Sequence, residues 1–380
     1  MVRKIPSLWK LEDTSKRSSF WSYLLFLAFI SLFLVPFDTI LSYNYDRIFD
    51  TICTLLFFLL IVAGLKECRA LDKIAQLALG GLKTTVSLCL VLIFLPFFSA
   101  MLFSNDVSLL TFVPLTIAIL ALADMKKLIA PVVILQTVAA NIGSSLTPFG
   151  NPHNLYIFNL KDFYGFSIMD YELALIPMVI VGTLLILLMI SLLPRNPLDV
   201  ELKDVELQCK PKLIVIIVLF ILAIITVLDV IPPYITLIIL VAAFLIMMPK
   251  IFLKVDYSIL FIFFFLFIFA NSISSVEGIH SFITDMMEWD PFLTTVMVSQ
   301  FTSNVPSTIL LQPFTDVWAA ILVGADVGGF GTPIASMASV ITLRLYLREE
   351  DSDVRQFLKY FFLIELAMLV VLIPTYYIFS

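Results

Sequence analysis

The sequence predicts an all-α polytopic membrane protein built from two inverted repeats, each with a re-entrant helical hairpin and a broken transmembrane helix. Three observations lead to this fold class. First, 61% of the 380 residues are apolar and 14% are charged, and the mean hydropathy is +1.06, values outside the soluble range. Second, a pair of polar interruptions occurs twice in the apolar sequence. Third, Lys and Arg divide between the loops as the two faces of a cell membrane require.

The duplicated interruptions are a Ser-Asn pair and a Gly-containing break. Ser-Asn occurs at 104–105 and 303–304, and in both places eight residues separate it from a proline. The pattern Ala-(Asn/Asp)-(Ile/Val)-Gly, three residues, then Thr-Pro occurs at 140–148 and 325–333. Polar, irregular backbone at membrane depth is tolerated only where it is packed in protein or lines a cavity. Paired interruptions in two halves of a chain therefore indicate a transporter's binding site.

The first transmembrane half is predicted over 20–194, after a polar, basic, cytoplasmic N-terminal segment at 1–19. The apolar run 20–40 is about 20 residues long, which is enough to cross the bilayer rather than form a cleaved signal. A second span is expected at 51–65. The stretch 68–81 has the apolar spacing of an amphipathic helix at the membrane interface.

The rest of this half contains the first hairpin, at 82–122, with its polar tip at 104–106. We favour a re-entrant hairpin over two full spans because almost no polar loop separates the two apolar arms. A broken helix follows at 128–159, and a span at 172–193 completes the half.

The second transmembrane half is predicted over 213–380, after a charged cytoplasmic linker at 195–212. It opens with an extra pair of spans and then repeats the order of the first half. The expected elements are spans at 213–230, 234–248 and 256–270, an acidic interfacial helix at 276–290, a hairpin at 291–322, a broken helix at 324–344 and a last span at 357–379.

The positions of the basic residues fit this layout. With the N-terminus in the cytoplasm and nine crossings, the C-terminus is external, and all of the 23 Lys and Arg except Arg47 and Lys161 fall on the cytoplasmic side. The same layout opens the first hairpin toward the cytoplasm and the second toward the outside. The two repeats are therefore expected to have opposite orientations in the membrane.

The polar residues at the interruptions are the candidate site. Asn105 and Asn304 offer uncharged amides at the centre of the membrane, and the alternative is a role in hydrogen bonds between helices. Thr147 and Thr332 place a hydroxyl beside a carbonyl freed by the following proline, unless they only restart a helix. Because a broken helix exposes amide N–H groups at one end and carbonyls at the other, it can bind anions and small cations.

Three titratable residues are candidates for a coupling proton. Asp106 and Asp326 are intramembrane acids, which are costly and usually functional, although each could instead cap the next half-helix. His153 carries an imidazole, the side chain that can gain or lose a proton near neutral pH, although a histidine after Asn-Pro is often only a polar residue at a helix start.

Motifs that are missing from the sequence narrow the function. It has no phosphate-binding GxxxxGK[ST] loop and no HExxH or GxSxG motif, so neither direct use of ATP nor hydrolase activity is expected. We predict that the protein is not an enzyme, needs no cofactor and binds no nucleic acid. The four cysteines, Cys53, Cys68, Cys89 and Cys209, lack the spacing of metal ligands.

At these interruptions the sequence resembles the ion transporter superfamily, which includes the ArsB arsenite permeases, NhaD sodium/proton antiporters, divalent anion/sodium symporters and citrate-transporter-like proteins. AANIGSSLTPFGNPHN and GADVGGFGTPIASMAS are similar to its two broken helices, and FSNDVSLLTFVPLT is similar to the hairpin of the ArsB and YbiR-like branch. The resemblance extends from Asp46 to the C-terminus. The Ser-Asn-Thr tip of the symporters is replaced here by Ser-Asn-Asp and Ser-Asn-Val.

The resemblance implies two sites for a coupling cation, with Na⁺ as one candidate, and a substrate site between the two tips. The implied cation ligands are Ser104, Asn105, Gly143, Ser303, Asn304 and Gly328. The residues expected at the substrate are Asn105, Thr147, Asn151, Asn154, Asn304 and Thr332.

The predicted function is secondary active transport of a small inorganic anion or carboxylate, coupled to Na⁺ or H⁺. The resemblance also implies elevator-like alternating access. The alternatives are a proton-driven exporter of arsenite or silicate type, a sodium/proton antiporter and, from another class, a channel or a non-transporting membrane receptor. Expected partners are an anionic or oxyanion solute, the coupling cation and the lipid bilayer, and a homodimer remains open.

Overall fold

The computed structural model describes residues 29–43, 45–80, 82–197, 206–349 and 352–380. These residues are mainly helical, and the only β-structure among them is an isolated bridge between Thr84 and Pro197. Within this part of the chain, seven helices are long and apolar enough to cross a membrane, and a bent helix pair makes an eighth candidate. The predicted all-α, multi-pass membrane fold is confirmed.

The first half contains helices α2 to α10. Their bounds are α2 Phe37–Leu41, α3 Asp46–Glu67, α4 Ala70–Leu79, α5 Thr85–Leu102, α6 Asn105–Leu122, α7 Lys126–Ser144, α8 Pro152–Phe158, α9 Lys161–Tyr164 and α10 Ile168–Ser191. Local sequence sets several of these ends. Thr84 and Ser167 each form a capping box at the start of α5 and α10, which satisfies amide groups that a helix leaves unpaired.

The predicted span 20–40 is interrupted near its end in the part that the structure describes. Helical structure ends before Pro36, and the short helix α2 then starts anew. Proline has no N–H to donate and disfavours a helical residue before it, which accounts for the break. Residues 1–28 of the predicted N-terminal segment and span lie outside the described residues.

The second half contains helices α11 to α19. Their bounds are α11 Lys210–Val227, α12 Pro233–Met247, the 3₁₀-helix η1 Pro249–Leu253, α13 Ser258–Ser274, α14 Glu277–Trp289, α15 Pro291–Thr302, α16 Asn304–Leu311, the 3₁₀-helix η2 Gln312–Phe314, α17 Trp318–Gly328, α18 Met337–Tyr346 and α19 Val354–Phe379. α13 and α14 meet at an angle of 99°. That angle turns the amphipathic α14 away from the direction of the apolar α13.

The predicted boundary between the second hairpin, 291–322, and the second broken helix, 324–344, is wrong. The second arm of the hairpin ends at Leu311, continues as η2, and is separated by a turn from α17, which starts at Trp318. Pro313 removes a backbone donor at this point, so an α-helix cannot pass through it with its hydrogen bonds intact. Residues 318–322 therefore belong to the broken helix.

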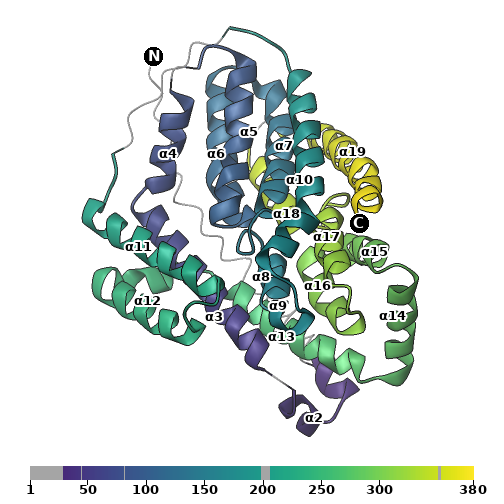
Figure 1. Ribbon diagram of the computed structural model, residues 1–380. Helices are drawn as coiled ribbons and strands as arrows, with labels where there is room; N and C mark the ends of the chain where they lie inside the picture. The colour runs from purple at the N-terminus through teal and green to yellow at the C-terminus, as the bar shows by residue number, and fades with distance from the viewer. Residues whose placement is uncertain (1–28, 44, 81, 198–205, 350–351) are drawn as a thin grey trace.

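Each hairpin packs on the broken helix of its own half (Figure 1). α5 and α6 pack on α7, and α15 and α16 pack on α17. The helices that restart after the breaks pack across the halves: α8 contacts α16 and α17 of the second half, whereas α18 contacts α6 and α7 of the first. α10 and α19 pack on each other and on both broken helices. As a result, the two breaks lie close to each other between the two halves.

The open end of the first hairpin lies near the linker between the halves. The Thr85 amide N–H donates to the Asn196 carbonyl at 2.9 Å. Lys254, in the turn before α13, forms an ion pair with Glu67 at the end of α3, and the Gln208 N–H donates to the Cys68 carbonyl at 3.1 Å. The loops expected in the cytoplasm contact one another in these ways.

The open end of the second hairpin lies near α9. The side-chain amide of Gln312, in η2, donates to the Tyr164 hydroxyl at 2.8 Å. Lys161 on α9 forms an ion pair with Asp229 in the turn between α11 and α12, and the rings of His280 on α14 and Phe314 lie 5.3 Å apart. The open ends of the two hairpins therefore belong to different groups of contacting loops. The inverted insertion of the repeats in a membrane stays a prediction.

Candidate functional site

The tip of the first hairpin is held on the first break by hydrogen bonds. Ser104 turns the chain between the arms with a positive φ of 131°. The N–H of Asn105 then donates to the Gly150 carbonyl at 3.2 Å, and the Thr147 hydroxyl donates to the Met101 carbonyl at 2.6 Å. The polar groups that lack helical partners at the break thus form hydrogen bonds with those that lack helical partners at the tip.

The tip of the second hairpin is held on the second break in the same way. Ser303 has a φ of 77°, the N–H of Asn304 donates to the Ala335 carbonyl at 2.9 Å, and the Thr332 hydroxyl donates to the Gln300 carbonyl at 2.8 Å. All of these residues occupy the positions that align with their partners in the first half. The duplicated sequence therefore builds a duplicated local structure, which we name the tip-on-break unit.

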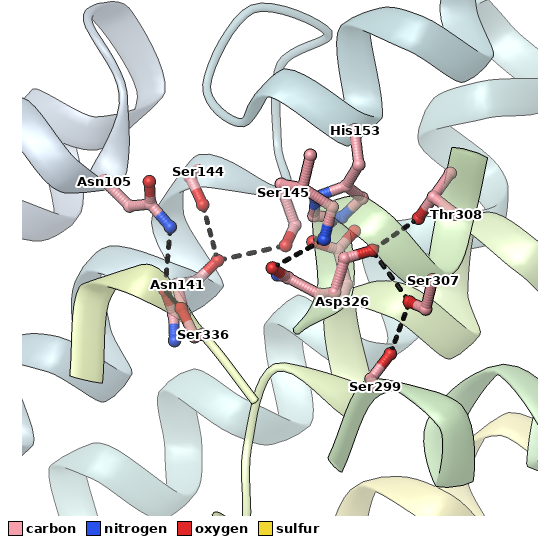
Figure 2. A network of polar contacts seen from close by, with 12 residues as sticks. Asn105, Asn141, Ser144, Ser145, His153, Ser299, Ser307, Thr308, Asp326 and Ser336 are labelled. Carbon is pink, nitrogen blue, oxygen red and sulfur yellow. Dashed lines mark hydrogen bonds and ion pairs between the residues drawn. The ribbon is translucent and has the colours of Figure 1, made fainter. Parts of the chain in front are cut away.

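The two tip-on-break units meet at Asn141, which lies in the last turn of α7. Its side-chain oxygen accepts a hydrogen bond from the Asn105 amide at 2.9 Å and lies 3.5 Å from the Ser336 hydroxyl, at the start of α18. Its backbone carbonyl accepts from Ser144 and Ser145. Figure 2 shows Asn105 above Asn141, and Ser336 next to Asn141, so the Asn141 side chain joins the first tip to the helix that restarts after the second break.

A buried histidine–carboxylate pair makes a second contact between the halves. The Nε2 atom of His153, on α8, lies 3.2 Å from a carboxylate oxygen of Asp326, on α17, and the two side chains are 0% and 2% exposed. Asp326 aligns with Asn141 in the repeat. Figure 2 places the pair between Asn105 on one side and Ser307 and Thr308 on the other. The equivalent position thus carries a neutral amide in one half and a titratable acid in the other.

Several buried polar atoms at this junction have no hydrogen-bond partner among the described residues. They are Nδ2 of Asn141, Nδ1 of His153, both side-chain polar atoms of Asn154, the second carboxylate oxygen of Asp326, and the hydroxyl of Ser339. Leaving a polar atom buried and unpaired costs about 1–3 kcal/mol, and such atoms in a folded protein call for an explanation. Donors and acceptors gathered in this way suit a polar solute.

Comparison with known proteins gives the family. A family model described as a citrate transporter matches residues 9–343. The chain belongs to the citrate transporter family. It is 34% identical over 300 residues to an uncharacterized transporter of Methanocaldococcus jannaschii, covering 78% of this chain and 80% of that protein. It is also 28% identical over 327 residues to the inner membrane protein YbiR of Escherichia coli, covering 85% and 86%.

Membership of the citrate transporter family confirms the resemblance to the ion transporter superfamily and makes the chain a multi-pass membrane transporter. The residues expected at the site can be placed within this framework. Asn151 and Asn154 are buried at the start of α8. Thr147 and Thr332 use their hydroxyls to bind the tips. Asp106 is half-buried in the first turn of α6, where its backbone N–H donates to the Asn105 side chain at 2.8 Å.

The glycines predicted near the cations are sites of close backbone approach in this member of the citrate transporter family. Gly143 lies against Phe97 of α5, and Gly328 lies against Ser299 of α15. The described residues contain no group of three or more His, Cys, Asp or Glu that could hold a metal ion. Oxygens of Ser, Asn and the backbone are the remaining candidates as ligands of a hard cation such as Na⁺.

Two residues at the site were not singled out from the sequence. Asn141 could have been found, because it aligns with the intramembrane Asp326. Gln300 had no such signal: its amide nitrogen donates to the carbonyls of Gly328 and Phe330, both at 2.9 Å, and its oxygen accepts from the Thr332 N–H at 3.0 Å. Gln300 therefore stabilises the second break through its side chain. Among the described residues, the first break has no equivalent contact, because the residue that aligns with Gln300 is Met101.

A polar cavity of about 270 Å³ lies between the halves. Tyr156, Tyr164 and Gln312 line it, and they are linked because the Tyr156 hydroxyl donates to the Gln312 side-chain oxygen at 3.0 Å and Tyr164 accepts from the Gln312 amide. Tyr156 lies one helical turn from His153 on α8. The cavity therefore comes close along α8 to the buried pair.

Proposed function

We propose that this protein is a secondary active transporter that moves a small carboxylate or inorganic anion by alternating access, coupled to H⁺ or Na⁺. One observation carries the proposal: two matching tip-on-break units meet in a buried polar network that contains unpaired donors and acceptors. A purely structural junction between helices has no use for such atoms, because each one destabilises the fold. A transported solute gives them partners.

The chemistry of the junction supports an anionic substrate. The start of α18 directs its amide groups and the positive end of its helix dipole toward the junction, and helix starts of this kind favour anions. Asn154 and Ser339 add side-chain donors in the first turns of α8 and α18. The description of the matching family as a citrate transporter supports a carboxylate among the anions.

The His153–Asp326 pair supports coupling to a cation. A buried carboxylate beside an imidazole can take up a proton, and its unpaired oxygen can instead face a small cation. A proton or cation that binds at this pair in one conformation but not in the other alters which conformation the transporter prefers.

The packing supports movement of the tip-on-break units relative to the rest. Within each unit the hairpin and the broken helix share hydrogen bonds. α3 packs mainly against α11, α12 and α13 and forms a framework at the side of the molecule, which meets the units where α13 contacts α16 and α3 contacts α8. An elevator-like step would carry a unit as one body along this framework.

The proposal is tested by uptake into proteoliposomes that contain the full-length protein. Radiolabelled citrate, succinate, phosphate, sulfate and arsenite are offered in turn, with imposed H⁺ or Na⁺ gradients of either direction. The proposal expects concentrative uptake of at least one anion that depends on one gradient. Uptake that follows membrane voltage alone would indicate a channel, and cation exchange without anion flux would indicate an antiporter; either result would overturn it.

A further inference from the structure

A single acidic residue lies in the middle of the last span. Glu365 is the only Asp or Glu of α19, and at 1.5 Å per residue it is about 17 Å from the start of the helix and about 21 Å from its end. A position so far from both ends places the carboxyl near the centre of a membrane-spanning helix. The established family membership assigns no role to it.

The Glu365 side chain is buried in protein rather than exposed on the outer face of the helix. Its exposed fraction is 0%, and neither carboxyl oxygen has a hydrogen-bond partner among the described residues. The backbone amide of Gly331 interacts with the carboxyl, in a geometry short of a full hydrogen bond. Gly331 belongs to the second break, has a positive φ of 111°, and is also approached by Leu369, one turn along α19.

No charged group of the surrounding helices pairs with Glu365. α19 packs on α7, α10 and α17, and ring contacts join it to α15 and α18. The titratable groups on or next to these helices, and on α19 itself, are Lys126, Lys127, Asp170, Tyr171, Glu172, Asp290, Asp326, Arg344, Tyr346, Asp353, Arg355, Lys359, Tyr360, Tyr376 and Tyr377. None of them is a partner of either Glu365 oxygen in the described part of the chain.

Such surroundings favour the neutral carboxyl. An ionised carboxylate with no counter-ion and only one backbone amide beside it is poorly solvated inside a protein, so the group holds a proton there instead. The protonated group can give up that proton only when water reaches it. Ionisable residues placed in this way within membrane helices are typical of proton pathways in transporters.

We propose that Glu365 is a proton-binding site through which transport is coupled to H⁺. The carboxyl keeps its proton while it is packed against the second break, and it transfers the proton to water when movement of the second tip-on-break unit uncovers it, leaving a hydrated carboxylate. Because Gly331 is part of the break that helps to form the substrate site, the movement that exposes the substrate also exposes the proton. This inference rests on the proposed transport function.

The first test compares two modes of transport in proteoliposomes, with radiolabelled citrate as the probe. In the isosteric but non-titratable Glu365→Gln variant, net uptake driven by a pH gradient is expected to fall by about tenfold or more, while exchange of citrate for citrate, which moves no net proton, stays within about twofold. Glu365→Asp keeps a carboxyl and is expected to retain uptake driven by the gradient. Glu288→Gln removes an exposed acid on α14 and serves as the matched control.

The second test does not depend on the substrate. Infrared difference spectra of the reconstituted protein between acidic and alkaline buffer are expected to contain the carbonyl stretch of a protonated carboxyl, absent in Glu365→Gln and present in Glu288→Gln. An unchanged band in Glu365→Gln would overturn the proposal, as would pH-driven uptake equal to that of the wild type. A lost band in a protein that transports none of the anions would support the proton site and refute the transport function.

Discussion

Asn105 and Asn304 occupy equivalent places in the two halves, but their surroundings differ in charge. The Asn105 amide donates to Asn141, whereas the residue that aligns with Asn141 in the second half is Asp326, held by His153. A neutral amide cannot carry charge through a transport cycle, but a carboxylate can. We therefore expect coupling to depend on the second half more than on the first.

The two tip asparagines provide a test at the scale of single residues. Asn105→Ala removes the amide that donates to Asn141, and Asn304→Ala removes the amide that accepts from the Val305 N–H at the second tip, while both leave the apolar packing of the arms in place. Each is expected to lower gradient-driven uptake by about tenfold or more, which corresponds to about 1.4 kcal/mol, the size of one good hydrogen bond. Uptake and the amount of folded protein in the membrane are measured together.

Asn196→Ala is the control, since Asn196 lies exposed in the linker. Wild-type uptake in both tip variants would show that these amides only join helices.

Among the elements, the broken helices depend on small residues where the hairpin arms press against them. A Cβ atom at Gly143 would lie 2.2 Å from the Phe97 carbonyl oxygen of α5. Backbone atoms cannot move aside as a flexible side chain can, so any larger residue at Gly143 pushes α5 and α7 apart. The first tip would then lose its fit on the first break.

Gly143→Ala therefore reverses the usual effect of replacing a helical glycine. Alanine in place of glycine inside a helix normally stabilises by about 0.5–1 kcal/mol, and Gly278→Ala on α14 is expected to behave so, because nothing lies within 4 Å of its added Cβ. Gly143→Ala is expected to lower the melting temperature in detergent and to abolish uptake. A melting temperature equal to or above that of the wild type would contradict the close packing of α5 on α7.

For the whole molecule, the decisive question is on which side of the membrane each group of contacting loops lies. The group near the first hairpin's open end includes the linker, and the group near the second includes α9 and η2. Inverted repeats require these groups to face opposite sides. The excess of basic residues in the first group predicts that this group lies in the cytoplasm.

Single cysteines test this arrangement in a variant from which the four native cysteines have been removed. Glu288→Cys on α14 and Lys210→Cys at the start of α11 are both at exposed positions. A membrane-impermeant thiol reagent added to intact cells is expected to label Glu288→Cys, and to label Lys210→Cys only after the cells are opened. Equal labelling of both in intact cells would refute the inverted arrangement.

The amino-acid sequence alone predicted most helices of this molecule, because hydropathy and short motifs are properties of neighbouring residues. Apolar length marks α3, α10 and α19, and the Ser-Asn pairs mark both tips, since a serine with positive φ can turn the chain between two helices. The errors fell at Pro36 and Pro313, where a helix predicted to be continuous is interrupted. At both positions the apolar sequence predicts a continuous helix, but proline lacks the backbone N–H that the helix needs there.

The sequence by itself determined that the chain is a duplicated membrane protein with two tips and two breaks, because hydropathy and repeated spacing are properties of the linear order. Only the tertiary structure decided that α8 packs on the second half and α18 on the first, which brings His153 to Asp326 and Ser336 to Asn141. It also decided that Glu365 faces protein and not the outer surface. Such contacts join residues far apart in the chain and depend on the direction in which each helix presents its side chains, which is fixed only when the helices pack.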